Sequence, residues 1–151
     1  MKNHLRRRVA VTVLVTSLLS ACFLSPPPTN KPDVNDLSGV WIPDKATLED
    51  MAERGGYDTT RQTKLILHAD GKLELVNMPD WLEKSDGESR HGLHSYTGSW
   101  EVTKSEKDWL LAISYSKKGT FFSIYGNKPP YKTGTYLGDP DSGNMMIFVK
   151  Q

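Results

Sequence analysis

Two histidines, His91 and His94, are the first candidates for chemistry in this chain of 151 residues. They lie three positions apart in a segment rich in glycine and serine, and the carboxylates of Asp86 and Glu88 precede them. Zinc accepts imidazole and carboxylate ligands, but a stable zinc site needs three or four of them in a defined geometry. Because no cysteine or third histidine is placed to complete the set, the pattern favours a solvated loop, and no metal or other cofactor is expected.

Ser89 lies close to these histidines, in the run 87–92, which superficially resembles the serine elbow of hydrolases. The elbow requires Gly-x-Ser-x-Gly between a strand and a helix. The run fits neither that spacing nor those elements. The chain is therefore expected not to be an enzyme, and a hydrolase that uses Ser89 or His91 is kept only as a remote alternative.

Asp139, Asp141 and Asn144 surround Gly143 and offer oxygen ligands to calcium. Their spacing differs from that of the EF-hand loop, and no glutamate closes the set. Pro140 suits the second position of a type I turn. The pattern therefore favours a turn over an ion site.

Trp81 lies outside any clear strand pattern. Tryptophan is over-represented among binding hot spots, so Trp81 is the leading candidate for an exposed anchor. The alternative is a tryptophan folded over the open end of the fold. Together with Arg90, His91 and His94, Trp81 forms the set of candidate binding residues.

Cys22 is the single cysteine of the chain, so no disulfide can form within it. It follows three arginines, an apolar run over residues 9–19 and small residues, the layout of a cleaved export signal. The run is about half of the ~20 residues that a membrane span needs. Leu19-Ser20-Ala21-Cys22 resembles the lipobox of bacterial lipoproteins. The resemblance implies cleavage before Cys22, diacylglycerol on its sulfur and an acyl chain on the new amino terminus.

Cleavage after residue 21 changes the charge of the chain. It removes four basic residues and no acidic one, which leaves fifteen basic against eighteen acidic residues and a net charge of −3. Nucleic-acid binding needs a basic surface and is not expected. Residues 22–36 are rich in proline and predict an extended, semi-rigid tether. Phe23, in place of an aspartate, resembles lipoproteins directed to the outer membrane, which implies a lipid anchor there and a domain facing the periplasm.

The remaining residues, 37–151, suffice for one compact domain. One helix is predicted over residues 46–54, with Asp44 as its cap and Gly55-Gly56 as its end. Elsewhere the apolar pattern has period two and predicts strands. The predicted strands cover residues 37–42, 63–68, 72–78, 96–104, 108–116, 120–125, 131–137 and 144–150.

The connections between these strands predict the topology. Asp70-Gly71 predicts a type I′ hairpin turn, and residues 80–95 are expected to form a long mobile loop. About eight strands with short connections predict an all-β fold, a small antiparallel up-and-down barrel with one short helix. Closure would remove the exposed edges of a flat sheet.

Gly39-Val40-Trp41 resembles the Gly-x-Trp opening of lipocalins and lipocalin-like bacterial barrels, and Gly98-Ser99-Trp100 repeats it. The resemblance implies that a tryptophan plugs the closed end of the barrel beside a bent glycine. The late arginine of true lipocalins has no counterpart after Arg90, and the domain is shorter than theirs. The ending over residues 137–148 is similar to that of small bacterial proteins of this strand pattern with no assigned activity.

These features predict a non-enzymatic binding module, anchored to the membrane through Cys22. It would bind a protein, an envelope component or a small apolar molecule through the barrel mouth, Trp81 and the loop 80–95. An alternative is an inhibitor or immunity lipoprotein against an envelope-targeting toxin or a lysozyme-like enzyme. The acidic net charge would suit a basic target.

Overall fold

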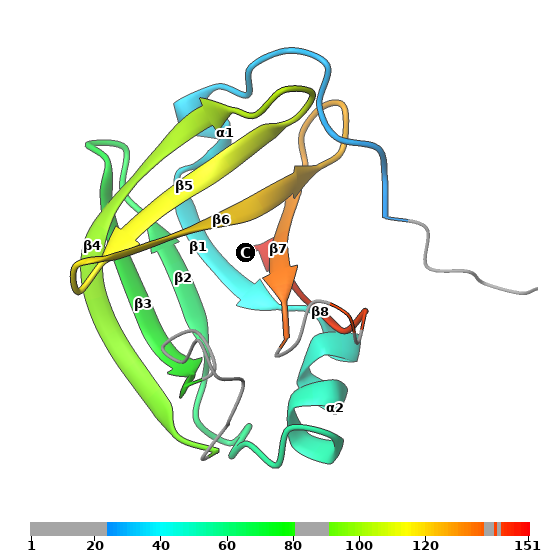
Figure 1. The fold of residues 1–151 in the computed structure, drawn as a ribbon, viewed down its shortest axis with the longest axis vertical. Helices are drawn as coiled ribbons and strands as arrows, with labels where there is room; N and C mark the ends of the chain where they lie inside the picture. Colours follow the sequence, from blue (N-terminus) through cyan, green and yellow to red (C-terminus); the bar gives the residue numbers. More distant parts are fainter. Residues whose placement is uncertain (1–23, 81–90, 138–140, 142) are drawn as a thin grey trace, which may run out of the picture.

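The computed structural model describes residues 24–80, 91–137, 141 and 143–151. Within them, eight strands form one closed antiparallel barrel in sequence order (Figure 1). The strands are β1 (Gly39–Pro43), β2 (Lys64–Leu67), β3 (Lys72–Pro79), β4 (Leu93–Lys104), β5 (Trp109–Tyr115), β6 (Lys118–Tyr125), β7 (Lys132–Tyr136) and β8 (Met145–Lys150). The predicted all-β barrel is confirmed.

Pairing between the first and last strands closes the barrel. Trp41 of β1 lies opposite Lys150 of β8, and Gly39 lies opposite Leu67 of β2. The backbone N–H of Gln151 adds a bond to the Val40 carbonyl at 2.9 Å. As a result, neither β1 nor β8 has a free edge.

Successive side chains of a strand point alternately into and out of the barrel, and the inward ones are mostly apolar and fill the interior. Trp41, Phe122 and Phe148 are fully buried, and the rings of the two phenylalanines stack with centroids 6.0 Å apart. Trp41 donates its indole N–H to the Leu37 carbonyl at 2.8 Å, which satisfies its one polar atom. Leu37 belongs to α1 (Val34–Leu37), a short helix where the sequence predicts the start of the first strand.

A second helix, α2 (Lys45–Glu53), lies at the opposite end of the barrel from α1 (Figure 1). Its predicted cap is confirmed, since the Asp44 carboxylate accepts the N–H of Thr47 at 2.9 Å. Thr47 is buried and joins α2 to β8, because its hydroxyl accepts the N–H of Ile147 at 2.9 Å. Gly56, with φ +64°, then turns the chain away from the helix.

The hairpin between β2 and β3 is confirmed, but its predicted turn type is wrong. In the turn, Gly71 alone has a positive φ (+83°), whereas a type I′ turn needs two such residues. The His68 carbonyl accepts the Gly71 N–H at 3.0 Å, which fits a type I turn followed by a glycine bulge. The I′ geometry occurs between β5 and β6, where Ser116 and Lys117 have φ values of 45° and 64°.

β4 begins earlier than the sequence predicts. Leu93 pairs with Pro79 and His94 pairs with Met78, so residues 93–95 belong to the sheet and not to a loop. A register shift between Leu75 and Met78 hid this pairing from the period-two pattern. Residues 81–90 lie outside the described part, as do Trp81 and Arg90.

The proline-rich segment before α1 packs on the barrel. Pro28 and Pro32 are buried. The Pro26 carbonyl accepts the N–H of Gly126 at 3.0 Å, and Thr29 donates its N–H to the Asn127 side chain at 3.1 Å. This arrangement differs from the free spacer that the composition predicts, because a composition does not reveal the pocket into which a proline fits. Across the residues that the structure describes, neither helix has the length and hydropathy needed to cross a bilayer.

Candidate binding site at the mouth of the barrel

The end of the barrel beside α2 carries a group of polar and aromatic side chains, which we call the mouth. It comprises Tyr57, Asp80, His94, Tyr96 and Tyr115. The end of β3, the start of β4 and the end of β5 bring four of them together, and the segment after α2 adds Tyr57. The barrel interior holds few other polar groups among the described residues, so this end is where hydrogen-bonding chemistry is available.

A buried carboxylate lies at the mouth. Asp80 is 3% exposed, and the hydroxyl of Tyr57, itself 5% exposed, donates to its Oδ1 at 3.1 Å. The N–H of Asp80 donates to the Gly92 carbonyl at 2.9 Å, which extends the β3–β4 pairing by one bond. A carboxylate away from water needs such donors, because burial without them is costly.

Gly92 separates this carboxylate from an imidazole. A Cβ placed on Gly92 would lie 2.9 Å from His94 Nε2 and 3.5 Å from Asp80 Oδ2. The two groups therefore flank the same glycine, and any larger residue there would push the imidazole aside. Carboxylate and imidazole together can accept and donate hydrogen bonds.

Three rings form a ladder along the inner wall of the mouth. The His94 ring stacks on Tyr96 with centroids 6.4 Å apart, and Tyr96 contacts Tyr115 at 5.2 Å. Among the residues that the structure describes, the buried Tyr96 hydroxyl has no hydrogen-bond partner. A buried hydroxyl normally has one, so an outside group that reached this atom would satisfy it.

His91 lies at the edge of the mouth and holds two segments together. Its Nδ1 hydrogen-bonds to the Gly55 carbonyl, and its ring meets Tyr57 edge-on at 5.9 Å. His91 has φ +60°, an uncommon backbone conformation for a residue other than glycine. Two of the four predicted binding residues, His91 and His94, therefore lie at one end of the fold.

The residues considered for a zinc site and for a calcium site are only partly within the described structure. Within the described ranges, no group of three or more histidine, cysteine or acidic side chains is arranged to hold a metal ion. Asn144, one of the residues considered as a calcium ligand and set aside in favour of a turn, accepts a hydrogen bond from Arg54 at 2.8 Å. Asp139, Asp86, Glu88 and Ser89 lie outside the described residues, as does Cys22.

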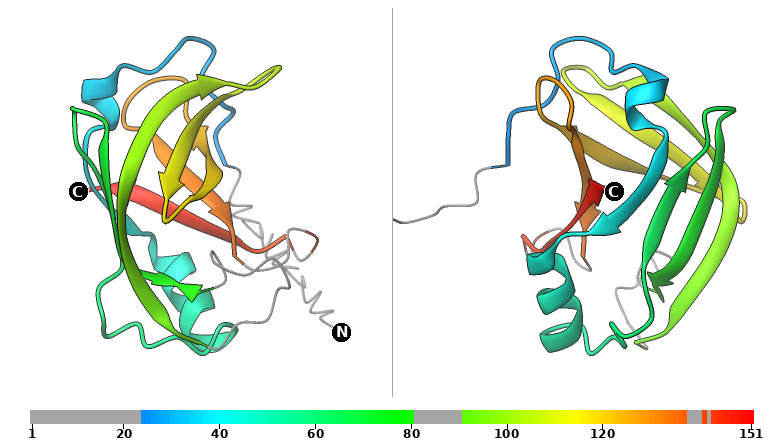
Figure 2. Two further views of the ribbon diagram at one scale, coloured as in Figure 1. Left: turned by 60° about the vertical axis from the view of Figure 1, so that its left-hand side comes forward. Right: turned by 180° about the vertical axis from the view of Figure 1, so that it is seen from behind.

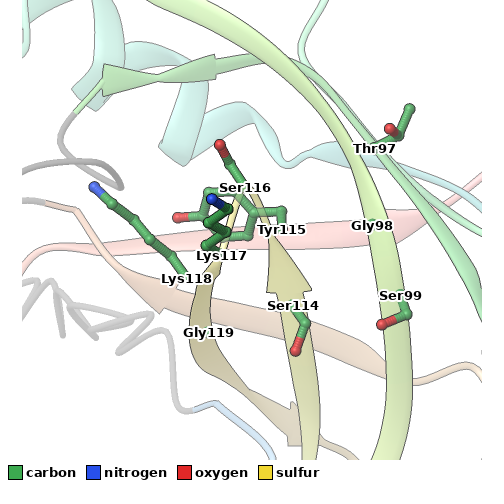
Figure 3. A pocket seen from close by; sticks show the side chains of 9 residues that line it. All are labelled: Thr97, Gly98, Ser99, Ser114, Tyr115, Ser116, Lys117, Lys118 and Gly119. Atoms are coloured by element: carbon green, nitrogen blue, oxygen red, sulfur yellow. The ribbon is translucent and has the colours of Figure 1, made fainter.

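A hollow lies on the outside of β4, β5 and β6 (Figure 3). It is an open groove of about 510 Å³. Ser99 and Ser114 lie on neighbouring strands, and Lys117 projects from the turn beside them (Figure 3). The groove offers hydroxyl and ammonium groups on an open surface, whereas the mouth holds a buried carboxylate, so the mouth is the stronger candidate site.

Several groups outside the mouth have shifted pKa values. The hydrogen bond and charge of Lys72 lower the pKa of Asp70, and the same contact raises the pKa of Lys72. Burial raises the pKa of Tyr125 and of Tyr131. Both tyrosines are therefore neutral over the physiological range.

Sequence reasoning missed Tyr57, Asp80, Tyr96 and Tyr115 as site residues. Tyr96 and Tyr115 alternate along strands and fit an ordinary core pattern. Tyr57 and Asp80 are separated by 23 positions, and neither belongs to a motif. The one available signal was an aspartate directly after an apolar strand, a position where a buried carboxylate needs a partner.

Comparison with known proteins gives no match to any family model, any curated protein or any solved structure.

Proposed function

We propose that the chain is a lipid-anchored, non-enzymatic binding module of the bacterial cell envelope. Its lipid anchor is Cys22 in the lipobox-like Leu19–Cys22, and its domain faces the periplasm from the outer membrane. It binds a partner at the mouth. The observation that carries this proposal is the buried, unpaired Tyr96 hydroxyl within the ring ladder of the described residues.

The packing of the barrel supports binding at the mouth in preference to the interior. Trp41, Phe122 and Phe148 occupy the centre with no exposed surface. The mouth instead offers stacked rings together with the carboxylate of Asp80. A purely apolar ligand would leave these polar groups unmatched, so the partner carries hydrogen-bonding groups, as a protein or an envelope polymer does.

A charge observation favours the inhibitor or immunity function as the second candidate. All eighteen acidic residues lie outside residues 109–138. The rest of the chain after residue 21 has eleven basic residues against these eighteen, a net charge of −7. An acidic surface steers a basic protein toward the domain, as a lysozyme-like enzyme or a basic toxin would require.

The test is capture of the partner by the anchored protein and by its Tyr96→Phe variant. The substitution removes one hydroxyl and keeps the ring. We expect the affinity to fall about fivefold to tenfold, since one hydrogen bond contributes about 1 kcal/mol. Stability should hold or rise, because an unsatisfied polar atom is removed. The wild-type protein and the variant are each used to capture components of the producing cell's envelope. Mass spectrometry then compares the amount of each component that the two proteins bind.

Tyr136→Phe is the matched control, because Tyr136 is exposed on the outside of the barrel. His94→Ala should weaken the same interaction as Tyr96→Phe. If every captured component bound both mouth variants as well as it binds wild type, binding at the mouth would be rejected.

A further inference from the structure

The outer surface of β5–β8 carries apolar side chains that the core does not use. Phe121 is 60% exposed and Tyr136 is 46% exposed. Ala112 pairs with Phe121, and Tyr136 pairs with Met145. Ser123 of β6 lies opposite Gly134 of β7. The same register, extended by two residues, places Phe121 opposite Tyr136. Neighbouring exposed aromatic residues mark an interaction surface more strongly than single ones do.

Tyr125 extends this surface along β6. It is partly buried, and its hydroxyl contacts the Met145 sulfur at 3.7 Å. We call the five residues Ala112, Phe121, Tyr125, Tyr136 and Met145 the outer aromatic face. Its border is Glu101 of β4, which pairs with Ala112.

The charge around the outer aromatic face is mainly positive, although Glu101 borders it on β4. Residues 109–138 contain four lysines and no acidic residue or arginine, so this part of the barrel has a charge of +4. β8 likewise contains no acidic residue. Lys128 and Lys132 are exposed on the β6–β7 connection and on β7. A cationic surface with exposed aromatic rings is complementary to an anionic lipid surface.

The described part of the chain starts at the same side of the barrel. Leu24, the first described residue, shares a pocket with Lys132 and Met145. The segment that leads from it runs beside the β6–β7 connection, as both figures of the whole fold show (Figures 1 and 2). Cys22 is two residues away, and two residues of extended chain span at most about 7 Å. A lipid on Cys22 would therefore be attached within this distance of Leu24.

We propose that the outer aromatic face rests on an anionic phospholipid surface when the chain is anchored. This proposal rests on the proposed anchoring through Cys22. The aromatic rings lie at the level of the headgroups, and the lysine side chains reach the phosphates. Because the face is on the side of the barrel, the mouth at its end stays open to a partner.

The test measures how fast a water-soluble maleimide modifies a cysteine on the face. The lipidated protein is placed in vesicles of phosphatidylethanolamine and phosphatidylglycerol, and Ser123→Cys adds a thiol beside Phe121. Ile66→Cys is the control, because β2 is four strands from β6 in the closed barrel. We expect the thiol at position 123 to react about tenfold more slowly than the thiol at position 66, since modification requires the face to lift off.

Two further measurements separate the contribution of the aromatic rings from that of the lysine charges. Phe121→Ser with Tyr136→Ser, both at exposed positions, should restore fast modification at position 123 while the protein stays on the vesicles. High salt, or vesicles of phosphatidylcholine alone, should weaken the protection because screening reduces the attraction of the lysines. Equal protection in all lipids and salts would overturn the proposal, since a second copy or another protein would then cover the face.

Sedimentation of the vesicles distinguishes failure of this proposal from failure of the anchor. If the protein sediments with vesicles and both thiols react equally fast, the anchor stands and the docked orientation is rejected. If the protein stays in solution, the proposed anchoring is rejected, and the docked orientation with it.

Discussion

The hydrogen bond between Tyr57 and Asp80 is the single contact that most constrains the mouth. Both side chains are buried, and the bond joins the segment after α2 to the end of β3. We expect Tyr57→Phe to lower the free energy of unfolding by about 1–3 kcal/mol, because a buried carboxylate loses a donor. Urea unfolding, followed by tryptophan fluorescence, measures the change.

The loss should depend on the charge of Asp80. In an Asp80→Asn background, Tyr57→Phe should cost only about 0.5–1.5 kcal/mol, the usual value for a bond between neutral groups. Tyr136→Phe, at an exposed position, is the control and should change stability by less than about 0.5 kcal/mol. A cost for Tyr57→Phe that matched this control would contradict a structural role for the bond.

Single residues were the hardest features to predict from the sequence. The spacing of His91 and His94 directed attention to the end of the barrel where the mouth lies, although the chemistry first considered there was metal binding. His94 stacks on Tyr96, two residues further along β4, whereas His91 contacts Gly55, which is 36 positions away and follows α2. No local pattern encodes a contact of the second kind, so the Tyr57–Asp80 pair was missed altogether.

At the scale of strands, Gly98 marks a close approach between neighbouring backbones. A Cβ at this position would lie 1.9 Å from the Ser114 carbonyl oxygen of β5. We expect Gly98→Ala to lower stability by more than about 3 kcal/mol, or to leave no folded protein, because a backbone atom cannot move aside alone. Circular dichroism and urea unfolding report both outcomes.

Gly119 provides the matched control for this substitution. It is a strand glycine of β6, and a Cβ there would lie 3.6 Å from the nearest atom, an ordinary contact. Gly119→Ala should leave stability unchanged or raise it by up to about 1 kcal/mol. If Gly98→Ala were as stable as Gly119→Ala, β4 and β5 would have to lie further apart at this point than the structure places them.

Strands and turns were predictable to the extent that their signals are local. Alternation of apolar residues placed all eight strands, and Asp44 placed the start of α2. The Asp70-Gly71 pair predicted a hairpin, but the turn type depends on how many residues the pairing leaves in the loop. α1 has only four residues, too few to show a helical period, so its Leu37 was assigned to the first strand.

At the scale of the whole molecule, the distribution of charge and the proposed lipid anchor favour the same orientation of the barrel on a membrane. The part of the barrel at residues 109–138 has a charge of +4, whereas the remainder after residue 21 has −7. Packing of residues 26–37 on the barrel removes most of the reach that a free proline-rich spacer would have, about 3 Å per residue. A lipid on Cys22 would therefore hold the basic side near the membrane and leave the acidic side for a basic partner.

The lipid anchor itself is tested by Cys22→Ala, expressed behind an export signal whose cleavage needs no cysteine. We expect the wild-type chain to incorporate labelled palmitate and to stay in the membrane after carbonate extraction, and the variant to do neither. The reason is that each buried methylene group contributes about 0.8 kcal/mol to membrane binding, so several acyl chains hold far more strongly than a protein surface alone. Equal retention of the variant and the wild type would show that Cys22 is not the anchor.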